Sequence, residues 1–167
     1  MKKLLMGLAL TLASLGSLFA QQGSELPATQ VQDLKGKKVA FNTVVEPGKV
    51  TLISFWATWC IPCMKEIKNI RTHLNDWKTE TPDFNYMAVS IDDSRASAQV
   101  KSYAKSQGWE FPCYLDPNSD LKRSLNFENV PFTIIVGKDG QIAYMHSGYE
   151  EGGEYVLYEK VKELAAQ

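Results

Sequence analysis

Residues 54–63 read Ser-Phe-Trp-Ala-Thr-Trp-Cys-Ile-Pro-Cys, and this stretch decides how the rest of the chain is interpreted. The apolar run that enters it, residues 50–55, is typical of a buried strand. After it, apolar side chains recur at steps of three and four residues, which predicts a helix from Cys60 to about Lys78. The members of this stripe are Met64, Ile67, Ile70, Leu74 and Trp77. The sequence therefore predicts a strand, a short turn and a helix that begins at a thiol.

The spacing of the two cysteines suits disulfide exchange. We expect Cys60 in the first turn of the helix, where unpaired backbone N–H groups and the positive end of the helix dipole favour a thiolate. Cys60 is therefore the expected nucleophile and the accessible thiol. Cys63 lies three residues on, within bonding reach, and is expected to be the shielded thiol that releases the substrate. Pro62 falls in the first turn, where its missing N–H is tolerated, and it stiffens the loop.

Alternative roles for the cysteine pair remain open. A structural disulfide is one, although a bridge that closes so short a ring constrains little chain. Half of a zinc site is another, but the remaining candidate ligands are scattered without ligand spacing. These candidates are Cys113, His73 and His146. Buried, inert cysteines fit poorly with the flanking tryptophans and the helix start.

The motif Phe55-Trp-Ala-Thr-Trp-Cys-Ile-Pro-Cys63 resembles the active site of thioredoxin-like thiol-disulfide oxidoreductases, in particular the exported TlpA/ResA/DsbE group. The resemblance extends over nearly the whole chain after residue 20. It implies an enzyme with an α/β, thioredoxin-like fold. In this fold a central mixed sheet is flanked by helices, with an N-terminal hairpin and an inserted helix-strand element.

The remaining segments are compatible with that fold. Residues 30–33 and 38–45 predict the hairpin, after a flexible lead at residues 21–27. Possible N-cap groups at Asp92-Asp93-Ser94 open a helix to about Gln107, and this helix with the strand after it resembles the inserted element. Further strands are predicted at residues 84–91, 111–115, 132–136 and 141–146, and helices at 119–125 and 154–166.

The N-terminus has the pattern of a secretory signal. Lys2 and Lys3 precede an apolar run to about Phe19, and cleavage is expected after Ala20. The alternative is an uncleaved membrane anchor, because the run is near the length of a short span. We therefore predict a signal peptide at residues 1–20 and one thioredoxin-like domain at residues 21–167, exported to the periplasm or another extracytoplasmic space.

Charge and composition give little reason to expect other partners. The chain has 18 basic and 19 acidic residues, a net charge of −1. Residues 1–20 hold two of the lysines and no acid, so the remainder is near −3 and has no basic cluster. Nothing here points to nucleic acid or to stable membrane insertion after cleavage. We also expect no metal and no cofactor.

A second functional feature is the Val130-Pro131 bond. An isolated X-Pro bond is usually trans. The resemblance instead implies a cis-proline beside the cysteine pair, where the backbone of Val130 would pair with an extended substrate peptide. We assign substrate contacts to Val130 and Pro131, and also to Trp59, Ile61 and Pro62.

Three positions qualify the resemblance. Thioredoxin has a buried Asp six residues before its first cysteine, where this chain has Ser54. Glu66, three residues beyond Cys63, resembles an acid that ResA-like proteins place near their active site, so we include it in the catalytic set. The alternative is a solvated helix glutamate. Ile61 supplies no positive charge to stabilise the thiolate, so nothing local argues for a strongly oxidising pair.

Three remaining residues receive no catalytic assignment. Cys113 lies in an apolar strand and is expected in the core, because free cysteine is among the most buried residue types. His73 and His146 have no partner at catalytic spacing.

By family likeness, the predicted function is reduction of protein disulfides outside the cytoplasm, such as those of apocytochrome c, with electrons from a membrane donor. The first alternative is an oxidant or isomerase that forms or reshuffles disulfides. The second is a non-catalytic module that binds partners beside Pro131. Turnover separates these alternatives, because a binding module would leave a protein disulfide intact.

Overall fold

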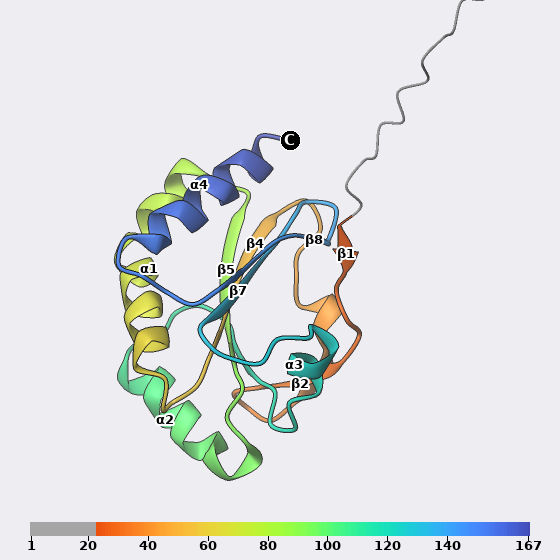
Figure 1. Ribbon diagram of the computed structural model, residues 1–167, viewed down its shortest axis with the longest axis vertical. Helices are drawn as coiled ribbons and strands as arrows, with labels where there is room; N and C mark the ends of the chain where they lie inside the picture. Colours follow the sequence, from red (N-terminus) through yellow and green to blue (C-terminus); the bar gives the residue numbers. More distant parts are fainter. Residues whose placement is uncertain (1–22) are drawn as a thin grey trace, which may run out of the picture.

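The computed structural model describes residues 23–167, so the predicted signal peptide, residues 1–20, lies outside the described residues. The elements are named in chain order, as in Figure 1. They are β1 Ser24–Glu25, β2 Gln30–Asp33, β3 Lys38–Ala40, η1 Phe41–Thr43, β4 Val50–Trp56, α1 Ile61–Glu80, β5 Phe84–Ser90, η2 Ser94–Ala96, α2 Ser97–Ser106, β6 Cys113–Leu115, α3 Asp120–Ser124, β7 Phe132–Val136, β8 Gln141–Ser147 and α4 Gly153–Ala165.

Within residues 23–167, eight strands form one mixed sheet in the order β1-β8-β7-β4-β5-β6-β2-β3. β4 runs parallel to β5 and antiparallel to β7. Every residue of β4 is buried, as expected for a strand with a continuous apolar sequence in the middle of a sheet. The strand that leads to the cysteines is therefore held on both edges and both faces.

Helices cover the two faces of the sheet unequally. α1, α2 and α4 lie on one side of it and α3 lies on the other (Figure 1). A first apolar core, under α1, α2 and α4, includes Leu52, Trp56 and Ile67. A second core, on the α3 side, includes Phe41, Phe55 and Leu121. Alternate residues of β4 contribute to opposite cores, so both packing layers fix the same strand.

These features confirm the thioredoxin-like fold. The predicted N-terminal hairpin is present, because β2 and β3 pair antiparallel. β6, which follows α2, pairs parallel with β5 and antiparallel with β2. The predicted helix-strand element thus supplies the strand that joins the hairpin to the sheet.

Two predictions at the N-terminal side of the domain were wrong. Residues 21–27 were expected to be a flexible lead, yet Ser24 and Glu25 pair with β8 and Leu26 is buried. The strand expected over residues 38–45 ends at Ala40, and Phe41 begins a 3-10 turn. The Phe41 N–H bonds to Thr29 O at 2.8 Å and its ring is fully buried, so tertiary packing overrides the local strand pattern.

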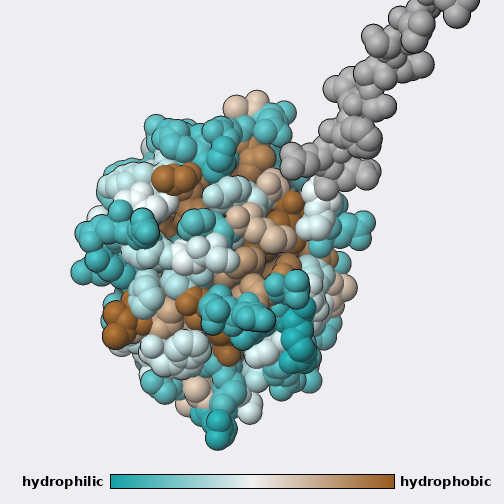
Figure 2. Space-filling model, in the orientation of Figure 1, coloured by the Kyte–Doolittle hydropathy of each residue, from teal (hydrophilic) through white to brown (hydrophobic). Residues whose placement is uncertain are grey.

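Hydrophilic residues dominate the face shown in Figure 2, with apolar residues reaching the surface in separate patches. No helix within residues 23–167 is long and apolar enough to span a membrane.

Candidate active site

The cysteine pair lies where β4 passes into α1. The turn between them closes with a hydrogen bond of 3.0 Å from Cys60 N to Ala57 O. The prediction placed Cys60 in the first helical turn, but it is the N-cap of α1, and the helix begins at Ile61. Pro62 lies within the first two helical positions, which tolerate its missing N–H.

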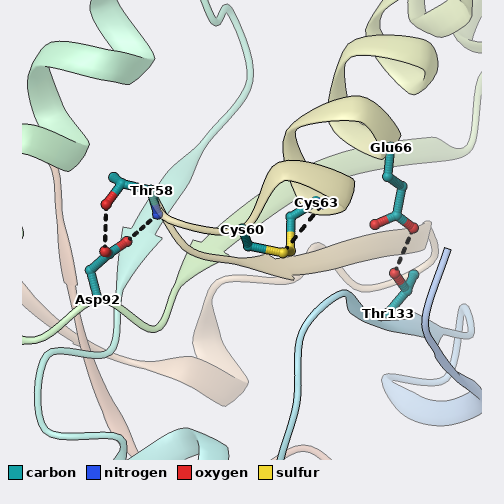
Figure 3. Close-up of a disulfide and its surroundings, with 6 residues drawn as sticks. All are labelled: Thr58, Cys60, Cys63, Glu66, Asp92 and Thr133. Carbon is teal, nitrogen blue, oxygen red and sulfur yellow. Dashed lines mark hydrogen bonds between the residues drawn. A yellow bond between two sulfur atoms is a disulfide. The ribbon is translucent and has the colours of Figure 1, made fainter.

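Cys60 and Cys63 form a disulfide, with their Cα atoms 5.3 Å apart (Figure 3). The Cys63 backbone N–H donates to Cys60 Sγ at 3.3 Å. An N-cap side chain ordinarily accepts such a bond through oxygen, and here sulfur takes that position. The N–H group that would stabilise a thiolate on Cys60 is therefore already directed at its sulfur.

Large apolar side chains surround a disulfide that is itself nearly covered. Trp59 is 68% exposed and Ile61 is 75% exposed, whereas Cys60 is 4% exposed and Cys63 is fully buried. The order of exposure of the two sulfur residues agrees with expectation, but Cys60 is far less open than an exposed helix start suggests. Two strongly exposed apolar side chains thus flank Cys60 in the sequence.

The Val130–Pro131 peptide bond is cis, as the resemblance implied. Pro131 precedes β7, whose first residue, Phe132, pairs with Phe55 at the end of β4. Pro131 O accepts a hydrogen bond of 2.8 Å from Gly148 N. The cis-proline segment is thereby tied to the sheet beside the strand that leads to Cys60.

Glu66 lies on the buried face of α1, with 1% of its surface exposed. This burial contradicts the alternative of a solvated helix glutamate. Thr133 Oγ1 donates to Glu66 Oε1 at 3.0 Å (Figure 3). Glu66 Oε2 has no hydrogen-bond partner among the described residues. Burial raises the pKa of Glu66 to about 7, with the charge of Glu154 adding to the rise and the Thr133 hydrogen bond opposing it. Glu66 can therefore gain or lose a proton near neutral pH.

Other polar groups lie beneath the same helix. Ser54 and Thr133 are direct partners across β4 and β7, so both face α1. Ser54 Oγ and the Tyr86 hydroxyl are buried without a hydrogen-bond partner among the described residues. Burial raises the pKa of Tyr86, which stays protonated near neutral pH, and the charge of Glu66 adds to the rise. The only group of this set that titrates near neutral pH is Glu66.

Sequence reasoning did not identify Thr133 as a site residue, and it predicted a different role for Asp92. Thr133 is the one hydroxyl in the apolar run Phe132-Thr-Ile-Ile-Val136, a signal that could have marked it. Asp92 was predicted to offer an N-cap group, but Asp93 caps the following turn by accepting from Arg95 N at 2.9 Å. Asp92 instead bonds to Thr58, in the turn before Cys60 (Figure 3).

The third cysteine and the two histidines make none of the contacts described above. Cys113 is buried and free, as expected, and burial raises the pKa of its thiol to about 12. His73 stacks on Trp77 and bonds to the Tyr155 hydroxyl at 3.0 Å. His146 lies on β8 opposite Thr133. Among residues 23–167 there is no cluster of three or more side chains that could hold a metal ion.

Comparison with known protein families shows to which family the chain belongs. The model of the AhpC/TSA family matches residues 22–145. The chain belongs to the AhpC/TSA family. Within this family it is similar to the thiol-disulfide oxidoreductase ResA of Bacillus subtilis (strain 168), with 26% identity over 127 residues, 76% of this chain and 68% of ResA. ResA of Geobacillus kaustophilus is 26% identical over 126 residues, 75% of this chain and 69% of that protein.

Solved structures agree with the family assignment. An uncharacterized thioredoxin-like protein from Porphyromonas gingivalis is 40% identical with a TM-score of 0.76, covering 87% of this chain and 94% of that one. A thiol:disulfide interchange protein DsbE, so named provisionally, from Chlorobium tepidum shares the fold at 21% identity. Its TM-score is 0.70, and the match covers 86% of this chain and 97% of that chain. This AhpC/TSA-family chain is thus a thioredoxin-like thiol-disulfide oxidoreductase that carries the Cys60–Cys63 pair.

Proposed function

We propose that the protein reduces disulfides of other proteins outside the cytoplasm, with Cys60 as nucleophile and Cys63 as resolving thiol. The observation that carries this proposal is the Cys63 N–H directed at Cys60 Sγ from 3.3 Å at the N-cap of α1. That N–H and the helix dipole favour negative charge on Cys60. Cys63, fully buried, has no comparable exposure to a substrate disulfide.

The proposed reaction begins with the reduced pair. The Cys60 thiolate attacks one sulfur of a substrate disulfide, whose S–S bond breaks, and the departing substrate thiolate takes a proton. Cys60 is then joined to the substrate in a mixed disulfide. Cys63 loses its proton and attacks Cys60 Sγ, which releases the second substrate thiolate. Two electrons have passed to the substrate, and the Cys60–Cys63 disulfide seen here is the product.

Glu66 is the proposed acceptor of the Cys63 proton. Burial raises the pKa of a thiol, so the resolving step needs a nearby base or water. Glu66 lies one helical turn beyond Cys63, is buried, and has a pKa raised to about 7. Its unpartnered Oε2 leaves a lone pair free for a proton.

Substrate contact is proposed at two adjoining segments. Trp59 and Ile61 would pack against the substrate, because both are largely exposed. Pro62, which is also exposed, lies in the first helical turn. Val130 would pair through its backbone with an extended peptide, next to cis Pro131. A protein segment that holds a disulfide could thus lie across the cysteine pair.

The location and the electron source belong to the same proposal. The signal-like sequence of residues 1–20 supports export, and an uncleaved anchor would leave the domain in the same compartment. A membrane thiol donor is then needed to return the pair to the reduced state. Likeness to ResA supports a cysteine pair such as that of apocytochrome c as substrate.

The experiment is reduction of a synthetic Cys-x-x-Cys-His peptide disulfide by the pre-reduced domain, followed by mass spectrometry of both partners. We expect one peptide reduced for each Cys60–Cys63 disulfide formed. In the converse assay, with the oxidised domain and the reduced peptide, net formation of the peptide disulfide would identify an oxidant. Failure of the domain to exchange with the peptide in either direction would refute catalysis and favour a binding module.

A further inference from the structure

Asp92 is a buried carboxylate that lies outside the disulfide chemistry described above. It follows β5 and is 2% exposed. Its Oδ1 accepts from Thr58 Oγ1 at 2.7 Å, and its Oδ2 accepts from Thr58 N at 2.9 Å and Ser90 Oγ at 2.8 Å. Within residues 23–167 none of the ion pairs includes Asp92. Three neutral donors therefore stabilise this buried charge.

Two of those donors belong to the turn that carries Cys60. Thr58 is two residues before Cys60, and the turn closes with the bond from Cys60 N to Ala57 O. The neighbouring Ile91 N–H donates to Trp56 O at 2.9 Å. The segment that follows β5 is thus bonded to the end of β4. Through Asp92 it is also bonded to Thr58 in the turn beyond β4 (Figure 3).

Capping of the next helix does not account for Asp92. The side chain of Asp93 performs that task by accepting from Arg95 N. The three hydrogen bonds offset the cost of burying this carboxyl group. Two of its three hydrogen bonds instead lead, through Thr58, to the turn before the attacking sulfur.

We propose that Asp92 is a positioning residue for Cys60. Acting through Thr58, its carboxylate fixes the turn so that Cys60 Sγ faces the Cys63 N–H. A reactive group must be held to within about 0.5 Å of its productive place, which a four-residue turn without a second attachment does not ensure. This inference rests on the proposed role of Cys60 as the attacking thiol.

Two substitutions separate the geometry from the charge. In Asp92→Asn the amide oxygen can take the place of Oδ2, and the amide nitrogen can donate to Thr58 Oγ1, so the turn stays attached without the charge. In Asp92→Ala the attachment and the charge are both lost. The difference between the Asn and Ala variants therefore reports on the attachment alone. Thr58→Val, which keeps the charge and loses one attachment, is a second test with Thr58→Ser as its conservative counterpart.

Asp116 supplies a matched control. It is also buried, at 1% exposure, and accepts from Leu121 N at 3.2 Å and Lys122 N at 2.9 Å at the start of α3. Asp116→Ala should lower stability without touching the turn before Cys60.

The readouts are the pH profile of iodoacetamide labelling of the reduced domain, resolved by mass spectrometry, and the free energy of unfolding. Relative to Asp92→Asn, we expect Asp92→Ala to raise the pH midpoint of Cys60 labelling by about one pH unit and to slow exchange about tenfold. Thr58→Val should change both in the same direction, and Thr58→Ser should match the parent. Asp116→Ala should leave the midpoint unchanged.

Each failure has a distinct meaning. First labelling at Cys63 in the parent would overturn the proposed role of Cys60. With Cys60 labelled first, equal profiles for Asp92→Asn and Asp92→Ala would overturn the positioning role. A midpoint shift of the same size in Asp116→Ala would overturn it as well, because general destabilisation would then be the cause. If Asp92→Ala does not fold, the Thr58 pair decides alone, and superimposable Val and Ser profiles refute the proposal.

Discussion

Thr133 Oγ1 on β7 donates a hydrogen bond of 3.0 Å to Glu66 Oε1 on α1. Thr133 is also the direct strand partner of Ser54. The resemblance to thioredoxin places an acid at Ser54, so this chain brings its carboxyl group to the same buried region from the helix above. The strand supplies only hydroxyl groups there. This arrangement makes Glu66 the group whose titration should be visible in both activity and stability.

Replacement of Glu66 should alter the pH dependence of exchange. In the parent, Glu66 becomes able to accept a proton as the pH rises through about 7. Glu66→Gln should lack this rise and exchange about 100-fold more slowly at pH 7.5, at the low end of the usual contribution of a base. The measurement is the rate of peptide disulfide reduction between pH 5 and pH 9.

Asp76→Asn is the control for that experiment, because Asp76 is an exposed carboxyl group on the same helix. Its profile should match the parent. Superimposable profiles for Glu66→Gln and the parent would leave the proton of Cys63 to water.

The same substitution should stabilise the domain at alkaline pH. The pKa of Glu66 rises from 4.5 in the unfolded chain to about 7 in the folded one, so the folded state binds the proton more tightly. This contribution is complete below about pH 4.5 and is lost as the pH rises through about 7. At about 1.4 kcal/mol per pH unit, the loss comes to roughly 3.5 kcal/mol.

Urea unfolding at pH 5 and pH 8.5 measures this effect. The parent should lose more free energy of unfolding between these pH values than Glu66→Gln does. Equal losses in the two proteins would mean that Glu66 is not protonated preferentially in the folded state.

Removal of the Thr133 hydroxyl should shift the titration of Glu66 in a known direction. The hydrogen bond from Thr133 lowers the pKa of Glu66, so its loss in Thr133→Val should raise that pKa. We expect the midpoint of the exchange profile to move up by about one pH unit, because a hydrogen bond to a charged group contributes about 1.5 kcal/mol or more. Thr133→Ser retains the donor and should keep the parent midpoint. A downward shift in Thr133→Val would contradict the assignment.

A trapped intermediate should reveal the natural substrates. Cys63→Ser keeps the nucleophile and removes the resolving thiol, so mixed disulfides through Cys60 should accumulate. Extracts of cells that express this variant, alkylated and separated without reductant, should show bands that disappear on reduction. Cys113→Ala is the matched control, and it should form no such bands because Cys63 is intact and resolves each mixed disulfide. Equal bands in both variants would point to nonspecific oxidation.

Local patterns in the sequence predicted most of the fold. The apolar run of β4 and the helical stripe of α1 lie within continuous segments, and each is visible without knowledge of its neighbours. β1 was not predicted, because Ser24 and Glu25 gain their structure from β8, more than 100 residues further along the chain. Phe41 does not lie in its expected strand for the same kind of reason, because its side chain packs in a core of residues that are distant in the sequence.

The residues of the site also differ in whether the sequence alone identifies them. Cys60 and Cys63 are identified by spacing, whereas the burial of Glu66 depends on β7 lying beneath α1. Asp92 and Asp93 are adjacent and chemically equivalent, and only the fold turns one toward Thr58 and the other toward Arg95. Sequence patterns can indicate which residues are able to cap or bind, but the partner is set by three-dimensional packing.

The reduction potential of the Cys60–Cys63 pair tests the central claim most directly, that the protein is a reductant of protein disulfides. The measurement equilibrates the domain in glutathione buffers at pH 7, traps it with acid and counts the free thiols by mass spectrometry. Glutaredoxins lie at about −200 to −230 mV and thioredoxin at about −270 mV, whereas the oxidant DsbA lies at about −120 mV. We predict a potential below about −200 mV for the pair. A potential above that value would contradict the reductant and identify the protein as a source of disulfides.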